Sequence, residues 1–557
     1  MVRIITNQKR NSVLLKLALF SILSAGSSQL IQSQNINILL GRPTDTSITV
    51  SIMFNQINDY YIEYGNQSGI YTFSTPTSTC VANVPDEVDL HNLLPDTKYY
   101  YRVKHRLSGG GVFIPTPEYS FHTQRSLGST FTFTLEADEH LYDKKGIDTM
   151  YKVTLRNEEA DHPDFMMSLG DIFGDDHHPS NISSQTLDSL HQYYRPLLGN
   201  ICHSIPFYDC LGNHEGEKDH YLDSMPPNNM AVWATLARKK YYPNPYPNGF
   251  YTGDTLHEGF GMGQPENYYA WTWGNALFVV LDVYRYDNDT TAKPIKWAWT
   301  LGSEQYEWLK STLQNSTSQY KFVFAHHVSG EGRGGIKQAK LYEWGGYDGA
   351  NGTTYSFPTY RPTWSMPIHQ LFVNYGVNIF FQGHDHLFAH EVMDNVTYQE
   401  VPMPADSTYK IGMLANATAY TADTVDGTGH IRVTVSPQCI QVDYVKAYLP
   451  IDTISGLHHN REIGFSYTLG NCLTTGINNS LNSENVIVFP NPAKDRLAVK
   501  LPEDVQHFQI IMNSTLGQTV LESQSKSIDL SGVPNGIYFL NIKTDKFETN
   551  KKVIINR

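Results

Sequence analysis

The chain has 557 residues, of which 40% are hydrophobic and 17% are charged. It is therefore long enough for about three or four domains, and it is neither a disordered chain nor a coiled coil. Lys and Arg number 41 against 55 for Asp and Glu, a formal net charge of −14, which argues against nucleic-acid binding through phosphate neutralisation and against a polybasic membrane-surface role.

The N-terminal segment, residues 1–33, has the layout of a signal peptide. Lys9 and Arg10 precede an apolar stretch over residues 13–25, and small and polar residues follow. Such a stretch is short for a transmembrane helix and is typical of an export signal. No later apolar run reaches the roughly 20 residues that span a bilayer. We therefore expect export and no transmembrane segment in the mature chain.

None of the five cysteines forms a CxxC pair, so a Cys-rich zinc site is not expected. Because export permits disulfides, two pairs are plausible, Cys202–Cys210 and Cys439–Cys472, and Cys80 is then left over. The sequence alone leaves this connectivity open.

The segment 35–125 has the pattern of a small β-sandwich. Residues 48–54 alternate between apolar and polar side chains, and a turn at Leu94–Thr97 leads into another alternating strand with Tyr99 and Tyr101. This segment resembles a fibronectin type III-like module, of the kind that precedes the catalytic domain in purple acid phosphatases. A generic sandwich spacer is the alternative interpretation.

The segment 128–450 has the texture of an α/β domain, because short, nearly continuous apolar runs alternate with helical stretches. Residues 276–281 predict a buried strand. A helix should follow, capped by Ser303, with an apolar stripe formed by Tyr306, Leu309 and Leu313.

Five apolar runs in this segment stop abruptly at residues able to bind a metal. The run 131–135 leads to Asp138-Glu139-His140, the run 165–169 to Gly170-Asp171, and the run 205–211 to Gly212-Asn213-His214-Glu215. The run 321–325 leads to His326-His327, and the run 377–382 to Gly383-His384-Asp385-His386. Ligands of open α/β folds bind at the carboxyl ends of strands, so we expect one crevice that gathers Asp138, His140, Asp171, Asn213, His326, His384 and His386. Oxygen and imidazole donors suit Zn²⁺, Mn²⁺ or iron, and seven donors point to two ions that share a carboxylate.

In this order the motifs resemble the calcineurin-like metallophosphoesterase superfamily, which includes purple acid phosphatases. The resemblance implies an α/β fold, an α/β/β/α sandwich, here flanked by two small all-β sandwich domains. It implies one metal bound by Asp138, His140 and His386, a second bound by Asn213, His326 and His384, and Asp171 bridging the two. It also implies Asp171 and His214 as catalytic residues, with His214 donating a proton or stabilising the transition state.

Two departures from the purple acid phosphatases stand out. Their second motif carries a tyrosine ligand where this chain has Gly174, and their first motif has glycine where this chain has His140. We therefore expect two divalent or trivalent metal ions, of iron, zinc or manganese, in an enzyme without the purple colour.

Three residues are candidates for substrate binding: His214, His327 and Arg333. The Gly-rich segment 329–335 presents Arg333, whose guanidinium suits a phosphate oxygen. An ordinary surface arginine is the alternative. Either His326 or His327 could be the metal ligand, and we favour His326 because ligands in the resembling family end the strand.

After a predicted linker over residues 451–483, the chain restarts at 484–557 as a small β domain. Its motifs, among them Pro490-Asn491-Pro492, Gly536-Ile537-Tyr538 and Lys551-Lys552-Val553, resemble the C-terminal sorting domain of type IX secretion cargo in Gram-negative bacteria. The resemblance implies the secretion machinery as a partner. An adhesive β domain retained in the mature enzyme is the alternative.

Together these patterns predict a secreted or cell-surface enzyme, exported through the periplasm, that hydrolyses a small-molecule phosphate ester by attack of a metal-bound hydroxide. A phosphatase is favoured. The alternatives are a phosphodiesterase or nucleotidase of the same fold, and a surface binding or adhesion protein with a vestigial metal site.

Overall fold

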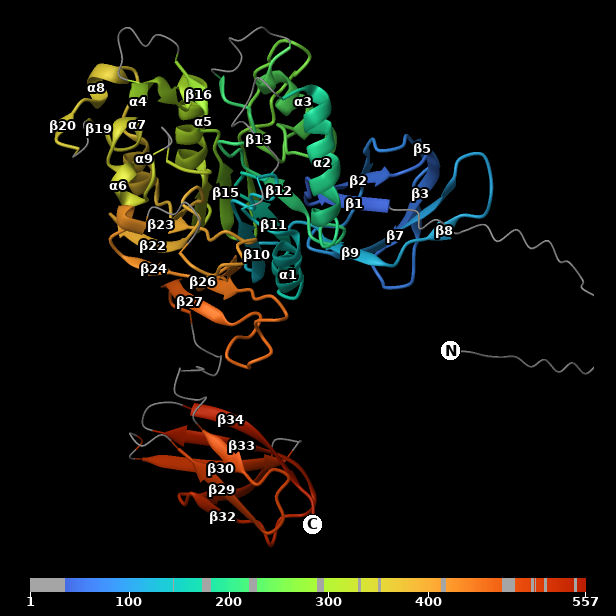
Figure 1. The fold of residues 1–557 in the computed structure, drawn as a ribbon, viewed down its shortest axis with the longest axis vertical. Helices are drawn as coiled ribbons and strands as arrows, with labels where there is room; N and C mark the ends of the chain where they lie inside the picture. Colours follow the sequence, from blue (N-terminus) through green and yellow to red (C-terminus); the bar gives the residue numbers. More distant parts are fainter. Residues whose placement is uncertain are drawn as a thin grey trace, which may run out of the picture. The chain divides into compact units, whose positions relative to one another are not determined.

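The computed structural model describes residues 36–143, 145–172, 182–219, 228–287, 295–328, 332–348, 352–411, 417–472, 486–501, 505, 507–514, 518–544 and 548–557 (Figure 1). The chain divides into two compact units, Met1–Arg432 with Tyr444–Phe465, and Val433–Asp443 with Ser466–Arg557. The predicted signal peptide, residues 1–33, and Gly174 lie outside the described residues.

The first unit begins with an all-β region, as expected. One sheet has the order β1 (Ile36–Gly41), β2 (Ile48–Phe54), β6 (Asp86–Leu90), and the other the order β4 (Phe73–Ser74), β3 (Asn58–Gly65), β7 (Lys98–Leu107), β8 (Ile114–Pro115), with β5 (Ser78–Cys80) on β3 and β9 (Tyr119–His122) on β7. Tyr99, Tyr101 and Val103 of β7 alternate into the buried core, which confirms the predicted alternation. The likeness to fibronectin type III stays a prediction.

This β region packs directly against the following α/β region of the same unit. Arg195 is fully buried, and its guanidinium donates hydrogen bonds to the carbonyl oxygens of Ser51, at 2.8 Å, and Tyr241. The backbone N–H of Leu40 donates to the carbonyl oxygen of Cys202 at 2.9 Å. Because a buried guanidinium needs such partners, the β region forms part of the support for the helices of the α/β region.

Two sheets form the middle of the α/β region. The first places β12 (Phe207–Asp209), β11 (Phe165–Ser168), β10 (Phe131–Glu136) and β25 (Gly429–Val435) in this order. The second has the order β13 (Thr252–Gly253), β14 (Tyr269–Trp273), β15 (Ala276–Val280), β18 (Tyr320–Phe324), β21 (Ile379–Gln382), β23 (Val396–Glu400), β22 (Phe388–Met393), β24 (Asp423–Val425). Strands β10, β11 and β12 are mutually parallel, as are β15, β18, β21 and β23.

Aromatic side chains fill the space between the two sheets. The ring of Phe278 in β15 lies 5.2 Å from that of Phe133 in β10 and 5.3 Å from that of Phe165 in β11, both edge-on. The opposite faces of the sheets are covered by helices, which bury apolar residues against them. The longer helices are α1 (Asp148–Glu159), α2 (Ser184–Leu198), α3 (Met230–Tyr241), α5 (Gly302–Asn315) and α9 (Ile368–Tyr375). This is the predicted α/β/β/α sandwich.

Short elements complete this region. They are β16 (Arg285–Tyr286), α4 (Ile295–Ala298), β17 (Trp299–Thr300), α6 (Ile336–Ala339), α7 (Tyr342–Gly345), β19 (Tyr347–Asp348), β20 (Thr354–Tyr355), α8 (Phe357–Tyr360) and the 3₁₀ turn η3 (Ala417–Ala419). Strands β26 (Cys439–Lys446) and β27 (Ile463–Gly470) follow, so part of the predicted linker is a strand.

Helix α5 confirms its predicted stripe but not its predicted cap. Tyr306, Leu309 and Leu313 are buried together. The N-cap position is Leu301, which has helical backbone angles and makes no side-chain cap. Ser303 is the second residue of the helix, and its hydroxyl donates a hydrogen bond to the carboxylate of Glu304. A capping side chain needs an extended backbone at the N-cap, so the cap prediction at Ser303 is wrong.

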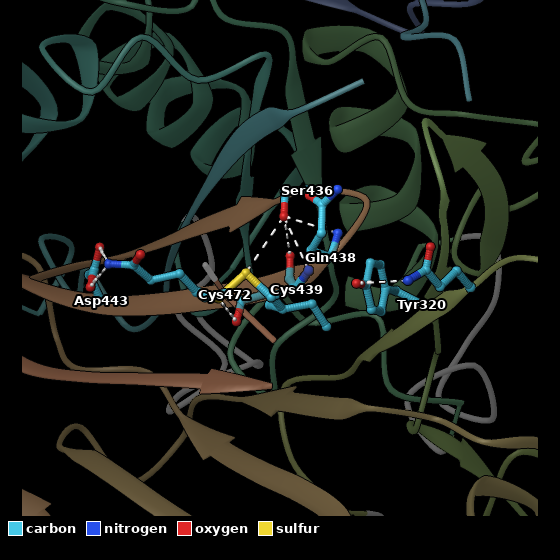
Figure 2. The surroundings of a disulfide bond; sticks show 9 residues. Tyr320, Ser436, Gln438, Cys439, Asp443 and Cys472 are labelled. Atoms are coloured by element: carbon cyan, nitrogen blue, oxygen red, sulfur yellow. Dashed lines mark hydrogen bonds between the residues drawn. A yellow bond between two sulfur atoms is a disulfide. The ribbon is translucent and has the colours of Figure 1, made fainter. Parts of the chain in front are cut away.

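Of the two plausible disulfides, one is present. Cys439 and Cys472 are joined, 33 residues apart in the second unit, and the side chain of Ser436 accepts a hydrogen bond from the backbone N–H of Cys439 at 3.1 Å (Figure 2). The pair Cys202–Cys210 is wrong, since both thiols are free and buried. They have separate surroundings: Cys202 Sγ contacts Met166 Sδ at 3.4 Å, and Cys210 Sγ contacts the Leu281 carbonyl oxygen at 3.6 Å.

The end of the second unit is a small all-β domain, as predicted. Its sheets have the orders β28 (Ile487–Phe489), β29 (Arg496–Lys500), β32 (Ser527–Asp529), and β31 (Thr519–Ser523), β30 (Phe508–Ser514), β33 (Gly536–Thr544), β34 (Glu548–Ile555). Leu497, Ile510 and Leu540 belong to its buried core. Among the described residues, no helix has the length and apolar character needed to cross a bilayer.

Candidate metal centre

The predicted donors all follow the carboxyl ends of strands. Of the parallel strands β10, β11 and β12, the first leads to Asp138 and His140, the second to Asp171 and the third to Asn213. Of the parallel strands β18 and β21, the first leads to His326 and the second to His384 and His386. Because parallel strands end at the same edge of a sheet, and the two sheets pack face to face, residues far apart in sequence meet at one edge.

Six of the seven donors form two compact groups. One consists of Asp138, His140 and His386, and the other of Asp171, His326 and His384; within each group the candidate ligand atoms lie within 4.8 Å of one another, and all six residues are buried. The seventh donor, Asn213, places its Oδ1 at 3.1 Å from Nε2 of His326, beside the second group.

Asp171, a member of the second group, also faces the first group. Its Oδ2 is 3.2 Å from Nε2 of His326 and 3.6 Å from Nε2 of His140. Its Oδ1 accepts a hydrogen bond from the backbone N–H of His214 at 2.8 Å. One oxygen is therefore held by the backbone while the other faces donors of both groups, as a shared ligand requires.

The first group contains buried polar atoms without hydrogen bonds, although Oδ1 of Asp138 lies 3.3 Å from Nε2 of His386. Oδ1 of Asp138 and Nε2 of His140, 3.7 Å apart, make no hydrogen bond within the described part of the chain. Unpaired polar atoms at full burial are costly and call for a missing partner. Carboxylate and imidazole donors together fit a divalent cation of the zinc, manganese or iron type.

The other ring nitrogens of two histidines are engaged. Nδ1 of His326 lies 2.8 Å from the carbonyl oxygen of Leu169, and Nδ1 of His140 lies 3.1 Å from the hydroxyl of Tyr142. Such contacts orient an imidazole and leave Nε2 for a metal. Both histidines therefore direct Nε2 toward the carboxylate of Asp171.

The backbone is strained at five of these donors. Positive φ angles occur at Asp138 (62°), His140 (45°), Asp171 (62°), His384 (77°) and His386 (58°). Non-glycine residues adopt this region uncommonly, and clusters of them mark functional sites held in place by surrounding structure.

The charges of the two groups depend on each other. Burial alone would raise the pKa of Asp171, but the charge interactions with His326 and His214 hold the pKa well below its usual value. Burial would lower the pKa of His326, but Asp171 and Asp138 raise it to about 9. Without a cation, the neighbouring carboxylates therefore favour the protonated form of His326.

His214, the predicted catalytic residue, lies beside both groups. Its Nε2 is 3.9 Å from Oδ2 of Asp171, and its ring centre is 5.5 Å from that of His140. Its side chain is 15% exposed, whereas the side chains of the neighbouring donors Asp171 and His140 are each 1% exposed. His214 can thus reach a ligand that approaches from solvent.

The two other predicted substrate contacts differ. His327 is 1% exposed, and its Nδ1 lies 2.7 Å from the carbonyl oxygen of Val328. Burial and the neighbouring His326 lower the pKa of His327 to about 3, so it is neutral. Arg333 is 32% exposed, and its Nη1 donates to the carbonyl oxygen of His384 at 2.5 Å and to Oδ1 of Asp385 at 3.0 Å.

Sequence reasoning missed several residues that hold the donors. The buried carboxylate of Glu215 accepts hydrogen bonds from the backbone N–H groups of Asp171 at 3.0 Å and Ile172 at 2.8 Å, and burial raises the pKa of Glu215 to about 7. Glu215 ends the motif that contains Asn213, so the motif itself was the available signal. Asp385 stands inside the Gly383-His384-Asp385-His386 motif in the same way, whereas Glu400 and Tyr420 carried no such signal.

Two family models match parts of the chain. Residues 131–388 match the family model described as calcineurin-like phosphoesterase, and residues 487–556 match the model described as a secretion system C-terminal sorting domain. No curated protein matches the chain.

Two solved structures share the fold. PhoD has 16% sequence identity and a TM-score of 0.54 over 78% of this chain and 90% of its own. A purple acid phosphatase, PPD1 from yellow lupin (Lupinus luteus) seeds, has 16% identity and a TM-score of 0.52 over 78% of this chain and 74% of its own. At these identities the likeness establishes the fold alone.

Proposed function

We propose, from the match of residues 131–388 to the calcineurin-like phosphoesterase family model, that the chain is a dinuclear metal-dependent phosphoesterase that favours phosphate monoesters. The observation that carries the proposal is Asp171, whose Oδ2 faces donors of two separate buried groups. Two neighbouring cation sites joined by one carboxylate are the arrangement that clamps both oxygens of an in-line displacement.

The donors divide between two ions in this proposal. One ion takes Asp138, His140 and His386, and the other takes Asn213, His326 and His384, with Asp171 shared. When bound, such ions supply a nucleophile at neutral pH and charge that stabilises the phosphoryl oxygens. Because Asn213 is a neutral ligand, the occupied site would keep a net positive charge that attracts an anionic substrate.

The protein's own groups orient the substrate and move protons. His214, at the exposed side of the centre, donates a proton to the leaving oxygen or a hydrogen bond to a phosphoryl oxygen. Arg333 is a candidate contact for a phosphate oxygen, since a guanidinium has five N–H donors and its described hydrogen bonds use Nη1. Buried His327 packs against His326 and His384 of the second group.

The C-terminal domain supports a location outside the cytoplasm. Its match to a secretion sorting domain indicates export and the secretion machinery as a partner. We propose a route through the periplasm to the cell surface or the medium.

A reconstitution experiment tests the function. Metal-free protein is supplied with Mn²⁺, Zn²⁺ or Fe²⁺, and phosphate release is measured from an aryl phosphate monoester and an aryl diester. We expect two ions per chain and faster monoester hydrolysis. Preference for the diester would replace the phosphatase assignment by a phosphodiesterase, and two bound ions without hydrolysis of either substrate would reject the assignment to these substrate classes. Protein that binds no metal would favour the surface binding or adhesion alternative.

A further inference from the structure

The loop that carries His384 and His386 holds two strained donors within three residues. Both have positive φ, at 77° and 58°. Such a conformation persists only when the surroundings fix it. The loop follows β21 and precedes β22, and its middle residue is Asp385, which belongs to neither donor group.

The backbone of this loop is held at three consecutive residues. The N–H of Gly383 donates to the carbonyl oxygen of His326, and the N–H of His384 donates to Oδ2 of Asp138, each at 2.8 Å. The N–H of Asp385 donates to Oε1 of Glu400 in β23 at 2.9 Å. Three consecutive amides are thus bound by residues from three other segments.

The side chain of Asp385 is held just as firmly. It is 1% exposed. Its Oδ1 accepts from Arg333 at 3.0 Å, and its Oδ2 accepts from the backbone N–H of Gly334 at 2.6 Å and the hydroxyl of Tyr420 at 2.7 Å. Gly334 has a φ of 109°, and a Cβ there would lie 2.9 Å from the Cβ of Ala419, so a larger residue would displace this contact.

Tyr420 joins this carboxylate to a second buried one. Its hydroxyl lies 2.7 Å from Oδ2 of Asp385 and 3.0 Å from Oε2 of Glu400, and that oxygen also accepts from Gln382 at 2.7 Å. Without the hydroxyl, two carboxyl groups would face each other with no donor between them.

We propose that Tyr420 is a positioning residue of the metal centre: its hydroxyl, which contacts both Asp385 and Glu400, holds the loop in the strained conformation that presents His384 and His386 as ligands. The proposal rests on the proposed metal-dependent function. Residues that orient ligands in this way typically change metal affinity by about 10- to 100-fold when they are removed.

The test compares Tyr420→Phe with a matched control, Tyr398→Phe. Tyr398 is also buried, in the same strand as Glu400, and its hydroxyl contacts His369 Nδ1 at 2.8 Å and the indole nitrogen of Trp344 at 3.3 Å. For full-length protein, Mn²⁺ and Zn²⁺ affinities are measured by competition with a chromogenic chelator, together with the unfolding temperature of each metal-free variant and hydrolysis as a function of metal concentration.

We expect Tyr420→Phe to weaken the affinity for at least one ion about 10-fold or more. Its hydrolysis should be lower than that of the wild type at low metal concentration and should recover at high metal concentration. Tyr398→Phe should change the affinity less than about 2-fold. Equal affinities for wild type and Tyr420→Phe would overturn the proposal, as would equal losses in both variants, which would indicate general destabilisation. Wild-type protein that binds neither ion would instead reject the proposed function.

Discussion

The backbone N–H of His384 donates a hydrogen bond of 2.8 Å to Oδ2 of Asp138, 246 residues earlier in the chain. A similar bond links the N–H of His214 to Oδ1 of Asp171. In both cases a backbone N–H of one motif binds one oxygen of a carboxylate in another motif. The other oxygen of that carboxylate faces the histidines. The motifs therefore support one another, and the loss of one donor should disturb the next.

Replacement of Asp171 by Asn tests the shared ligand. The carboxamide can still accept from His214, but it lacks the charge that two cations would share. We expect kcat to fall by more than about 100-fold, beyond the loss typical of residues outside the ligand set, and the metal content to drop below two ions per chain. Steady-state kinetics and elemental analysis measure both effects.

The control is Asp188→Asn, which removes the same charge from a half-buried pair with Lys240. It should leave both quantities unchanged. Full activity with two bound ions in Asp171→Asn would exclude the shared role.

His214→Ala separates proton transfer from metal binding. Because His214 is not one of the proposed metal ligands and lies at the exposed side of the centre, we expect the metal content to stay near two, while kcat falls by about 10²- to 10⁴-fold, the usual contribution of a positioned acid or base. The exposed His91 provides the control, since His91→Ala should retain wild-type kinetics. A variant at His214 with unchanged kcat would remove it from the mechanism.

Asp161 gives stability a dependence on pH. Burial would raise its pKa, but hydrogen bonding and charge interaction with His430, together with Arg432 and Arg461, hold the pKa below its usual value. A lowered carboxyl pKa stabilises the fold above the unfolded value of about 3.9, and this contribution is lost as the pH falls through the folded value.

We therefore expect Asp161→Asn to lower the free energy of unfolding at pH 7 by about 3 kcal/mol, the lower end for breaking a buried pair, because Arg461 is 42% exposed. The difference from wild type should shrink as the pH drops below about 4. Urea unfolding at pH 7 and pH 3 measures it, and a difference that stays constant between them would contradict the assignment.

The disulfide prediction concerns the second unit. Opening the 33-residue loop between Cys439 and Cys472, by replacing both with Ser, should destabilise this unit by about 3 to 4 kcal/mol in the chain-entropy model. Reduction of the wild type should produce the same shift and leave the double variant unchanged. Thiol titration of the unfolded, unreduced protein should find three free cysteines; one free thiol would mean that Cys202 and Cys210 pair as well.

Much of the fold could be predicted because local patterns carry it. Apolar runs of four to six residues correspond closely to β10, β11, β18 and β21, since a strand buried on both faces needs continuous apolar sequence. The stripe of α5 follows from helical periodicity in the same way. The cap at Ser303 failed because capping depends on the backbone angles of one residue, which the approach of the chain to α5 decides.

The donor types and their order were readable from the sequence by itself, because each motif is a short run of residues directly after a strand. Only the tertiary structure decided how they act together. Asp171 faces both groups because two sheets pack face to face, Glu215 holds backbone amides that are 43 and 44 residues away, and Tyr420 reaches Asp385 across 35 residues. Such contacts depend on distance in space, so even where a motif marks a residue, as it does Glu215, the sequence does not show which distant group that residue contacts.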